Sequence, residues 1–262
     1  MARENSFNFF GVVDTVPIVL FNEESKTYRV TFTMKTVRRN GRQDFPKISI
    51  YSLTEDQARE YVQLLKEGVW VQVRGMVSTK MVDKHIKCEA CGHVSPIGTL
   101  QTEIVTYGKP LILKEKFEPI QVAEFANVGN MMGVLCTEIQ RKDGDSGPTA
   151  AQFQLAVNRR YKVSELEKAT RTDFPWIKVF GETADECIRR AHKSSQIYLT
   201  GAFQTRDVQR RVMCNSCGGK LIYLERVGEV IPTGVEFLYN CNFVSKEERE
   251  GLHAGGDDNE KK

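Results

Sequence analysis

Four cysteines of this chain form two Cys-x-x-Cys-Gly motifs, and their types and spacing point most directly to chemistry. Cys88 and Cys91 form the first motif, and Cys214 and Cys217 form the second. Two thiolates at this spacing can face one ion, while the following glycine lets the backbone fold back. Because each motif supplies two ligands and a structural zinc ion takes four, the sequence predicts a structural Zn²⁺ site that joins both motifs.

Two alternatives to that site are consistent with the sequence. A redox dithiol has the same spacing, but it normally opens a helix, whereas the residues flanking both motifs alternate like hairpin strands. The second pair of ligands could also come from another chain, which would make the metal a condition of dimerisation. The three other cysteines are expected to be small buried side chains.

A second candidate surface lies on a predicted strand at residues 174–180, which alternates between an aliphatic side and an aromatic side. The aromatic side carries Phe174, Trp176, Lys178 and Phe180. Three rings around a lysine suit stacked bases and a phosphate backbone better than they suit water. Any one ring alone is as readily explained as a core or interface residue, but the group favours a nucleic-acid surface.

The neighbouring segments predict the frame that positions this strand. Residues 183–186 are Thr-Ala-Asp-Glu, a capping box that predicts a helix from Ala184 to about Lys193. A further strand is expected over residues 196–205, with Gly201 at a position where a curved strand needs no side chain. A strand, a helix, a strand and a basic hairpin make up the second half of an OB-fold barrel.

These segments resemble the bacterial and phage single-stranded DNA-binding protein family. The resemblance is carried by residues 153–161, 174–180, 181–186 and 197–206, and it covers the second half of the chain better than the first. It implies OB-fold barrels, no enzymatic activity, and a protein that coats single-stranded DNA without sequence specificity. The implied setting is replication, recombination or DNA transfer in the cytoplasm of a bacterial or phage-infected cell.

The first half of the chain repeats the second. Residues 75–91 match residues 201–217 without a gap, and a capping box at Thr54 matches the one at Thr183. Alternating apolar residues extend the match upstream, where Met34 is aligned with Val157. A duplicated domain explains these matches.

The duplication predicts an all-β protein of two tandem OB-fold barrels, each with a short helix between strands three and four and a zinc-knuckle hairpin. We place the first barrel in residues 1–116 and the second in residues 127–244. Residues 117–126 form the expected linker, and the polar residues 245–262 form an expected disordered tail.

The predicted DNA interface combines aromatic rings with cations from both copies. The resemblance implies base stacking by Tyr161, Phe174 and Phe180, and Phe45 and Tyr51 are first-copy equivalents of the last two. Basic loops in both copies would bind phosphates, although a solvated charged loop explains either loop alone. The full predicted set is Lys35, Arg38, Arg39, Phe45, Lys47, Tyr51, Arg74, Lys80, Arg159, Arg160, Tyr161, Phe174, Trp176, Lys178, Phe180 and Arg206.

The composition limits the classes of function. The formal net charge of the 262 residues is +3, which permits nucleic-acid binding without requiring it. No apolar run approaches the ~18 residues that span a bilayer, and the N-terminal residues lack a signal-peptide pattern, so we expect a soluble protein with no membrane partner. No Ser/His/Asp set, carboxylate cluster or phosphate-binding loop predicts an enzyme.

The predicted partners are single-stranded DNA and a second copy of the chain. Family members with one barrel usually form tetramers, so the resemblance implies that a two-barrel chain forms a homodimer. Replication or recombination proteins are candidate partners, but the chain ends in Lys261-Lys262, without the acidic tip that docks them in the family. Two other functions fit the sequence: an RNA-binding tandem OB protein, and a recombination mediator or scaffold whose barrels bind proteins.

Overall fold

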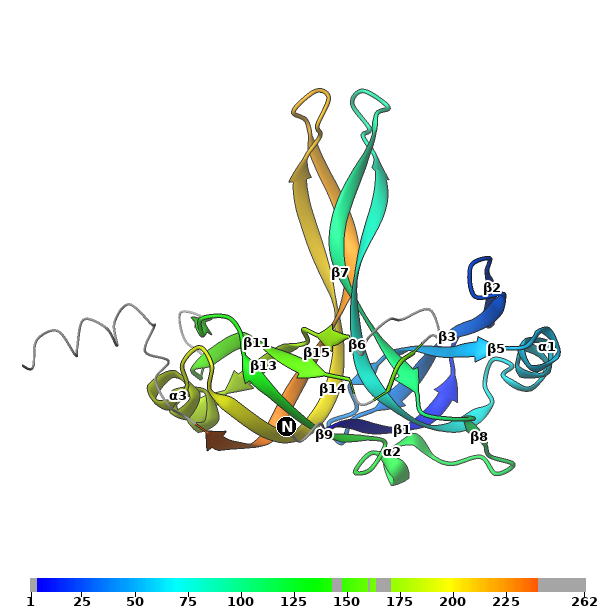
Figure 1. Ribbon diagram of the computed structural model, residues 1–262, viewed down its shortest axis with the longest axis horizontal. Coiled ribbons are helices and arrows are strands. Elements are labelled where there is room, and N and C mark those ends of the chain that lie inside the picture. Colours follow the sequence, from blue (N-terminus) through cyan, green and yellow to red (C-terminus); the bar gives the residue numbers. More distant parts are fainter. Residues whose placement is uncertain (1–3, 143–147, 160, 164–170, 240–262) are drawn as a thin grey trace, which may run out of the picture.

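The computed structural model describes residues 4–142, 148–159, 161–163 and 171–239, which fold into two similar, mostly β halves (Figure 1). The first half contains β1 (Asn5–Val13), β2 (Ile18–Asn22), β3 (Thr27–Val37), β4 (Gln43–Asp44), β5 (Lys47–Leu53), α1 (Glu55–Leu64), β6 (Trp70–Lys87), β7 (Val94–Thr106) and β8 (Leu111–Ile112). A short helix, α2 (Pro119–Val122), precedes the second half. The second half contains β9 (Asn127–Leu135), β10 (Gln140–Arg141), β11 (Ala150–Asn158), β12 (Thr172–Asp173), β13 (Trp176–Phe180), α3 (Gly181–Arg190), β14 (Gln196–Met213) and β15 (Lys220–Tyr239).

Within each half, five strands pair in a ring. β1 pairs with β3, β3 with β5, β5 with β7, β7 with β6, and β6 pairs again with β1. The second half repeats this order with β9, β11, β13, β15 and β14. In these rings only β5 with β7 and β13 with β15 are parallel. The mostly β class predicted from the sequence is confirmed.

The two halves join edge to edge through β1 and β9. These strands pair antiparallel, from Asn5 opposite Met131 to Phe9 opposite Asn127, and link both rings into one sheet. The core is likewise continuous, because buried side chains of both halves form a single cluster. Gly129 lies where a side chain would collide with the ring of Phe7, since an added Cβ would come within 2.2 Å of it.

Helices α1 and α3 start differently. Helix α1 has the predicted capping box, in which the Thr54 hydroxyl accepts from the Gln57 N–H and the Gln57 side chain accepts from the Thr54 N–H. The helix predicted from Ala184 is present as α3, but its predicted start is wrong, because α3 begins at Gly181 and Thr183 lies inside it without capping it. Gly181 has φ of 57°, which glycine adopts without steric cost, so the chain turns directly from β13 into the helix.

Strand β3 is equivalent to β11 in a register two residues away from the sequence alignment. Met34 lies opposite Val13 in β1, and Leu155 lies opposite Leu135 in β9. Met34 is therefore equivalent to Leu155, and the predicted match with Val157 is wrong. Alternating aliphatic residues look the same after a shift of two, so the sequence pattern does not distinguish the registers. The corrected register makes Arg38 equivalent to Arg159.

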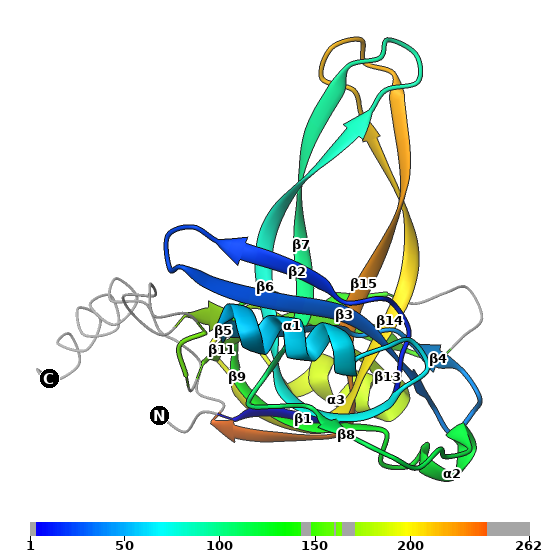
Figure 2. The same cartoon turned by 90° about the vertical axis from the view of Figure 1, so that its right-hand side faces the viewer.

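The pairs β6–β7 and β14–β15 extend beyond the rings as two long hairpins (Figures 1 and 2). They rise side by side, and their tips lie together. Near the tips, Leu221 and neighbouring apolar side chains of both hairpins form a small cluster with Cys88 and Cys214. Lower down, Glu225 of the second hairpin accepts from Lys84 of the first at 2.9 Å.

The connection between the halves packs against the first half. Phe117, Val122 and Ala126 of this connection contact Trp70 and Phe10 in a separate apolar cluster. Trp70 is consequently only 8% exposed. No helix in the described part of the chain has the length and apolar character needed to cross a membrane.

Candidate metal centre and nucleic-acid interface

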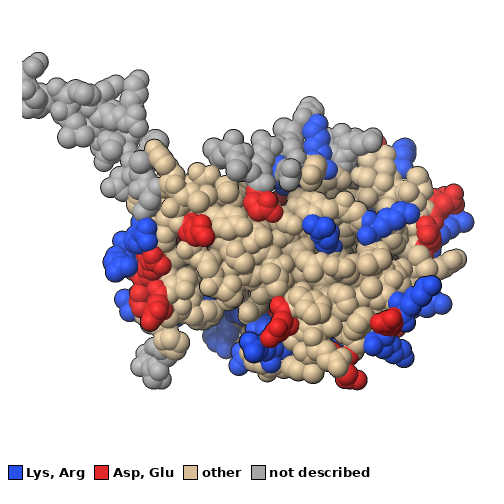
Figure 3. All heavy atoms as spheres, turned by 90° about the horizontal axis from the view of Figure 1, so that it is seen from below, with Lys and Arg blue, Asp and Glu red and all other residues tan. Residues whose placement is uncertain are grey.

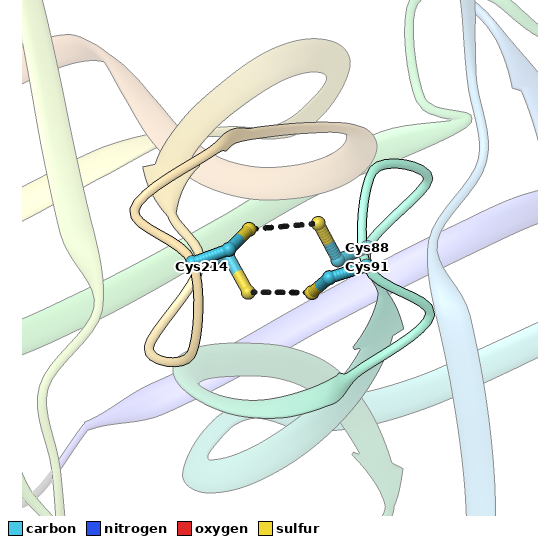
Figure 4. A group of neighbouring side chains, drawn as sticks. Cys88, Cys91 and Cys214 are labelled. Carbon is cyan, nitrogen blue, oxygen red and sulfur yellow. Dashed lines mark hydrogen bonds between the residues drawn. The ribbon is translucent and has the colours of Figure 1, made fainter.

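Four cysteine sulfurs lie together at the tips of the hairpins (Figure 4). The Sγ atoms of Cys88 and Cys217 are 3.7 Å apart, those of Cys91 and Cys214 are 3.8 Å apart, and all four lie within 4.8 Å of one another. Sulfurs at the corners of a tetrahedron with Zn–S bonds of about 2.3 Å are about 3.8 Å apart. One chain therefore brings the four predicted cysteines together, at a spacing that fits a tetrahedral metal ion.

Each cysteine motif is a tight turn closed at its glycine. Gly92 donates its N–H to the carbonyl of Cys88 at 2.8 Å, and Gly218 donates to the carbonyl of Cys214 at 3.0 Å. The φ angles of these glycines are 73° and 71°, in the region that side chains disfavour. The repeated turn aims both pairs of sulfurs toward the gap between the hairpins (Figure 4).

The thiols of the cluster hold their protons unequally. Backbone N–H groups of Cys217 and Ser216 lower the pKa of Cys214 to about 6. For Cys91, the backbone N–H of His93 acts in the same direction, but the sulfur of Cys217 and burial outweigh it and raise the pKa to about 12. A bound metal ion replaces the protons on all of its thiol ligands, so metal affinity rises with pH.

The outer side of β13, with Phe174 just before it, is the second candidate site. Phe174 and Phe180 are 41% and 45% exposed, and Trp176 and Lys178 are partly exposed between them. The Lys178 ammonium lies 5.2 Å from the centre of the Phe180 ring, a cation–π contact. The aliphatic residues of the strand are buried, so the aromatic side predicted from the sequence faces outward.

Two grooves run along this side of β13. One, of about 440 Å³, joins Phe180 to Arg42 in the first half. The other, of about 340 Å³, leads from Trp176 to Tyr223 on the second hairpin. Arg206 lines both grooves, so they meet beneath the hairpins. An extended chain of nucleotides fits such a surface better than a compact ligand does.

On the equivalent face of the first half, the two predicted rings contact side chains of the same chain. The Arg226 guanidinium lies 4.7 Å from the centre of the Phe45 ring. The Tyr51 hydroxyl accepts from Arg29 at 2.8 Å and donates to Glu103 at 2.6 Å. A base that stacked on Phe45 would first have to displace the guanidinium.

Buried glutamates engage two of the predicted cations. Glu103 accepts from Lys80 at 3.0 Å, and Glu229 of the second half accepts from Arg206 at 2.7 Å. Burial by itself raises the pKa of Glu103, but the ion pair with Lys80 and the hydrogen bond from Tyr51 outweigh burial, and the pKa lies below its usual value. Lys80 and Arg206 are therefore partly neutralised before any phosphate approaches.

Two of the predicted DNA contacts form ion pairs within the chain. Arg38 donates to Asp44 at 2.6 Å through Nε, and Arg159 donates to Asp173 at 2.7 Å through Nε and to Ser78 at 2.8 Å. The side chain of Arg159 is 5% exposed, so the prediction that it contacts DNA is corrected. That of Arg38 is 21% exposed and remains at the edge of the groove.

The same carboxylates hold the two halves together. Asp44 accepts the N–H of Thr205 from the second half at 2.6 Å, and Asp173 accepts the N–H of Thr79 from the first half at 2.7 Å. Each half thus contributes one aspartate to the other half, in equivalent places. Asp44 and Asp173 each begin an Asp-Phe-Pro segment, and both segments are points where the halves are joined.

The other predicted contacts differ in exposure. Lys47 is half-buried, and this burial lowers the pKa of its ammonium group. Arg160 lies outside the described residues. Five of the remaining predicted DNA contacts are exposed or partly exposed: Lys35, Arg39, Lys47, Arg74 and Tyr161.

Two exposed or partly exposed aromatic residues, Tyr107 and Tyr223, were not predicted from the sequence to contact DNA. The other copy has Thr233 and Ile97 at the matching positions, so comparison of the copies gave no signal. For Tyr223 the available signal was the alternation of its hairpin strand, which places it opposite Arg210 on the inner side.

This chain is similar to known proteins in sequence and in structure. Residues 126–216 match the model of the single-strand binding protein family. The single-stranded DNA-binding protein 1 of Chlorobaculum tepidum is 32% identical over 77 residues, which are 29% of this chain and 48% of that protein. The resemblance predicted from the sequence is confirmed. The matching region of the family includes β13 and the second cysteine motif up to Ser216.

Solved structures of single-stranded DNA binding proteins share the fold over nearly the whole chain. The wild-type single-stranded DNA binding protein from Thermus aquaticus has a TM-score of 0.62 at 13% identity, covering 95% of this chain and 100% of that one. A deletion mutant of the same protein has a TM-score of 0.60 at 14% identity, covering 90% and 96%. The curated relative matches over about half its own length, whereas these structures also extend over the first half of this chain.

Proposed function

We propose that this chain is a non-enzymatic protein that coats single-stranded DNA without sequence specificity. The observation that carries the proposal is the outward side of β13, where Phe174, Trp176 and Phe180 surround Lys178 inside the region that matches the family. Exposed rings stack on bases of any identity, and neighbouring cations bind the backbone. The relatives from Chlorobaculum and Thermus are named as single-stranded DNA-binding proteins, which supports this function. Replication, recombination and DNA transfer are the processes that expose such strands.

Each ring of five strands is, in this proposal, an OB-fold barrel. The closed pairing, with a helix between the third and fourth strands, supports this architecture. The first barrel then occupies residues 1–116 and the second residues 127–244. The connection at residues 117–126 is a packed segment of the first barrel's surface.

The four-cysteine cluster is proposed to hold a structural Zn²⁺ ion. Cys88, Cys91, Cys214 and Cys217 would supply four thiolates, which fill a tetrahedral site and leave no position for water or substrate. Thiolate ligands in this geometry are those that zinc takes in structural sites. When bound, the ion supplies a crosslink between the two hairpins. The close sulfur pairs lie between motifs, unlike those of a redox dithiol within one motif.

A thymidine homopolymer should quench Trp176, with an affinity that falls steeply as salt rises, because phosphates release counterions on binding. Phe174→Ala should weaken binding by about 1–3 kcal/mol, the typical loss of one stacked base. Phe45→Ala is the matched control and should lose less, because Arg226 covers that ring. Fluorescence titration in a Trp70→Phe background measures both variants, since Trp70 is buried.

Unchanged affinity in Phe174→Ala, with the fold intact by circular dichroism, would exclude β13 as the binding face. Equal losses in the two variants would mean that the first half opens on binding. Competition with a uridine homopolymer of the same length distinguishes a DNA-binding protein from an RNA-binding one.

We propose that two copies associate through the side opposite the hairpins. Figure 3 views this side, where charged side chains lie mainly toward the margins and the centre is largely uncharged. β1 and β9 cross this side (Figure 1), with Asn8, Asn130 and Met132 on their outer faces. Light scattering should give twice the chain mass of 29.8 kDa, and Met132→Glu should shift the mass toward the monomer. A stable wild-type monomer at micromolar concentration would contradict the dimer.

A further inference from the structure

A groove of about 670 Å³ lies where the two halves meet. Arg74, Tyr107 and Lys109 of the first half line it together with Asn158 and Tyr161 of the second. A hollow of about 370 Å³ shares Tyr107, Lys109 and Tyr161 with it and continues to Tyr51 and Tyr61. We call this continuous surface the tyrosine groove. It shares no lining residue with the grooves along β13.

The rings at the centre of the tyrosine groove are exposed and held in place. Tyr107 and Tyr161 are 39% and 52% exposed, and their rings meet edge to face with centroids 5.8 Å apart. The Tyr107 hydroxyl donates to the carbonyl of Asn5, and the Asn5 side chain is itself fixed by two hydrogen bonds to Val77. Rings fixed in this way offer bases a stacking surface at little entropic cost.

The tyrosine groove also carries cations without acidic partners. Within the described residues, neither Arg74 nor Lys109 forms an ion pair, and Glu4 is the one carboxylate in the lining of the larger hollow. By contrast, Arg206 and Arg210, beside β13, donate to buried glutamates. Arg74 and Lys109 are therefore available to phosphates without first breaking an ion pair.

The duplicated fold does not require these groove residues, because the matching described positions of the other copy hold different residue types. Gly75 pairs with Thr106 in the first half as Gly201 pairs with Pro232 in the second, which fixes the equivalence of the two hairpin bases. Together with the match of Arg38 to Arg159, this register gives the equivalent residues. Arg74, Tyr107 and Tyr161 correspond to Thr200, Thr233 and Asn40. Tyr107 and Tyr161 thus have no aromatic counterpart at the matching positions of the other copy, and Arg74 has no cationic counterpart.

We propose that the tyrosine groove is a second binding site for the same single strand, separate from the side of β13. Bases stack on Tyr107 and Tyr161 while Arg74 and Lys109 bind the phosphates beside them. The proposal rests on the proposed function, and it means that one strand must be long enough to reach from one half to the other.

Oligothymidylates of increasing length test the second site. For the shortest oligonucleotides that quench Trp176, Tyr107→Ala should bind like the wild type. For longer ones its affinity should be roughly 5- to 150-fold lower, the equivalent of one lost stacked base. Thr233→Ala, at the matching position of the second half, should bind all lengths like the wild type. Tyr107→Phe keeps the ring but loses the bond to Asn5, and it should bind long oligonucleotides like the wild type.

Each remaining outcome contradicts a particular claim. If Tyr107→Ala binds every length like the wild type while Phe174→Ala is weakened, the second site is wrong and the proposed function stands. If Tyr107→Phe is as weak as Tyr107→Ala, the hydroxyl maintains the fold and the ring does not stack. If the wild type binds no oligonucleotide, the proposed function fails and this site fails with it.

Discussion

Cys214→Ser should reduce bound zinc from one ion per chain to almost none and detach the two hairpin tips from each other. The reason is that a structural zinc site depends on all four ligands, and serine does not replace a thiolate at neutral pH. Structural zinc contributes about 10–16 kcal/mol to the folding of small zinc-finger peptides, so losing the ion should remove most of the order at the tips. Elemental analysis measures the metal, and hydrogen exchange of the hairpin amides measures the order.

Cys136→Ser is the matched control for this experiment. Cys136 is half-buried and donates from its thiol to the Gln154 carbonyl at 3.3 Å, a bond that serine also makes. It lies outside the four-sulfur cluster, so zinc content and exchange should not change. Purified wild-type protein without zinc, or a Cys214→Ser variant with full zinc content, would refute the crosslink.

The structure also bears on which chain supplies the ligands. All four sulfurs lie within 4.8 Å of one another in a single chain, so a second chain is not needed to complete the site. Chelating the metal should accordingly loosen the hairpins without changing the particle mass. A halved mass after chelation would instead place the ligands on two chains.

Asp173→Ala should lower the free energy of unfolding by about 3–5 kcal/mol, the usual cost of leaving one partner of a buried ion pair alone. Arg159 would keep its charge with 5% of its side chain exposed. The variant also removes the acceptor for the Thr79 N–H, which joins the halves. Urea denaturation measures the change as a lower midpoint at an unchanged slope.

Asp44→Ala is the equivalent change in the first half and should cost less. The side chain of Arg38 is 21% exposed, so water can solvate its guanidinium once Asp44 is gone. Equal losses in the two variants would show that the shared backbone bonds across the halves, and not burial of the arginine, set the cost.

Local patterns in the sequence predicted the features that depend on spacing alone. The cysteine motifs were found because two thiols and a glycine at fixed spacing have few other uses, and the Thr54 cap was found because its partner is three residues away. The cap predicted at Thr183 is wrong, although residues 183–186 also match the capping-box motif. Gly181 can adopt a positive φ and start the helix earlier, and the motif gives no information on that choice.

These local patterns did not predict contacts between distant segments of the chain. Arg159 and Phe45 appeared as a cation and a ring in exposed segments. The pairing of β12 with β11 brings Asp173 to Arg159, and the packing of the second hairpin against the first half brings Arg226 to Phe45. Tyr107 was missed because the other copy has no aromatic residue at the matching position. A search for what two copies share passes over a residue that only one copy has.

The joint between β1 and β9 has a consequence for how the two copies diverge. Two identical subunits in an isologous contact carry every substitution twice, once on each side of the axis. Here both sides belong to one chain, so a substitution alters one side and leaves its counterpart unchanged. The ring of Phe45 can be covered by Arg226 while the ring of Phe174 stays exposed. Tyr107 can likewise appear in one copy while the other copy has Thr233. Neither change affects the pairing of β1 with β9 that holds the halves together. A duplication within one chain can therefore turn a symmetric surface into one with a direction.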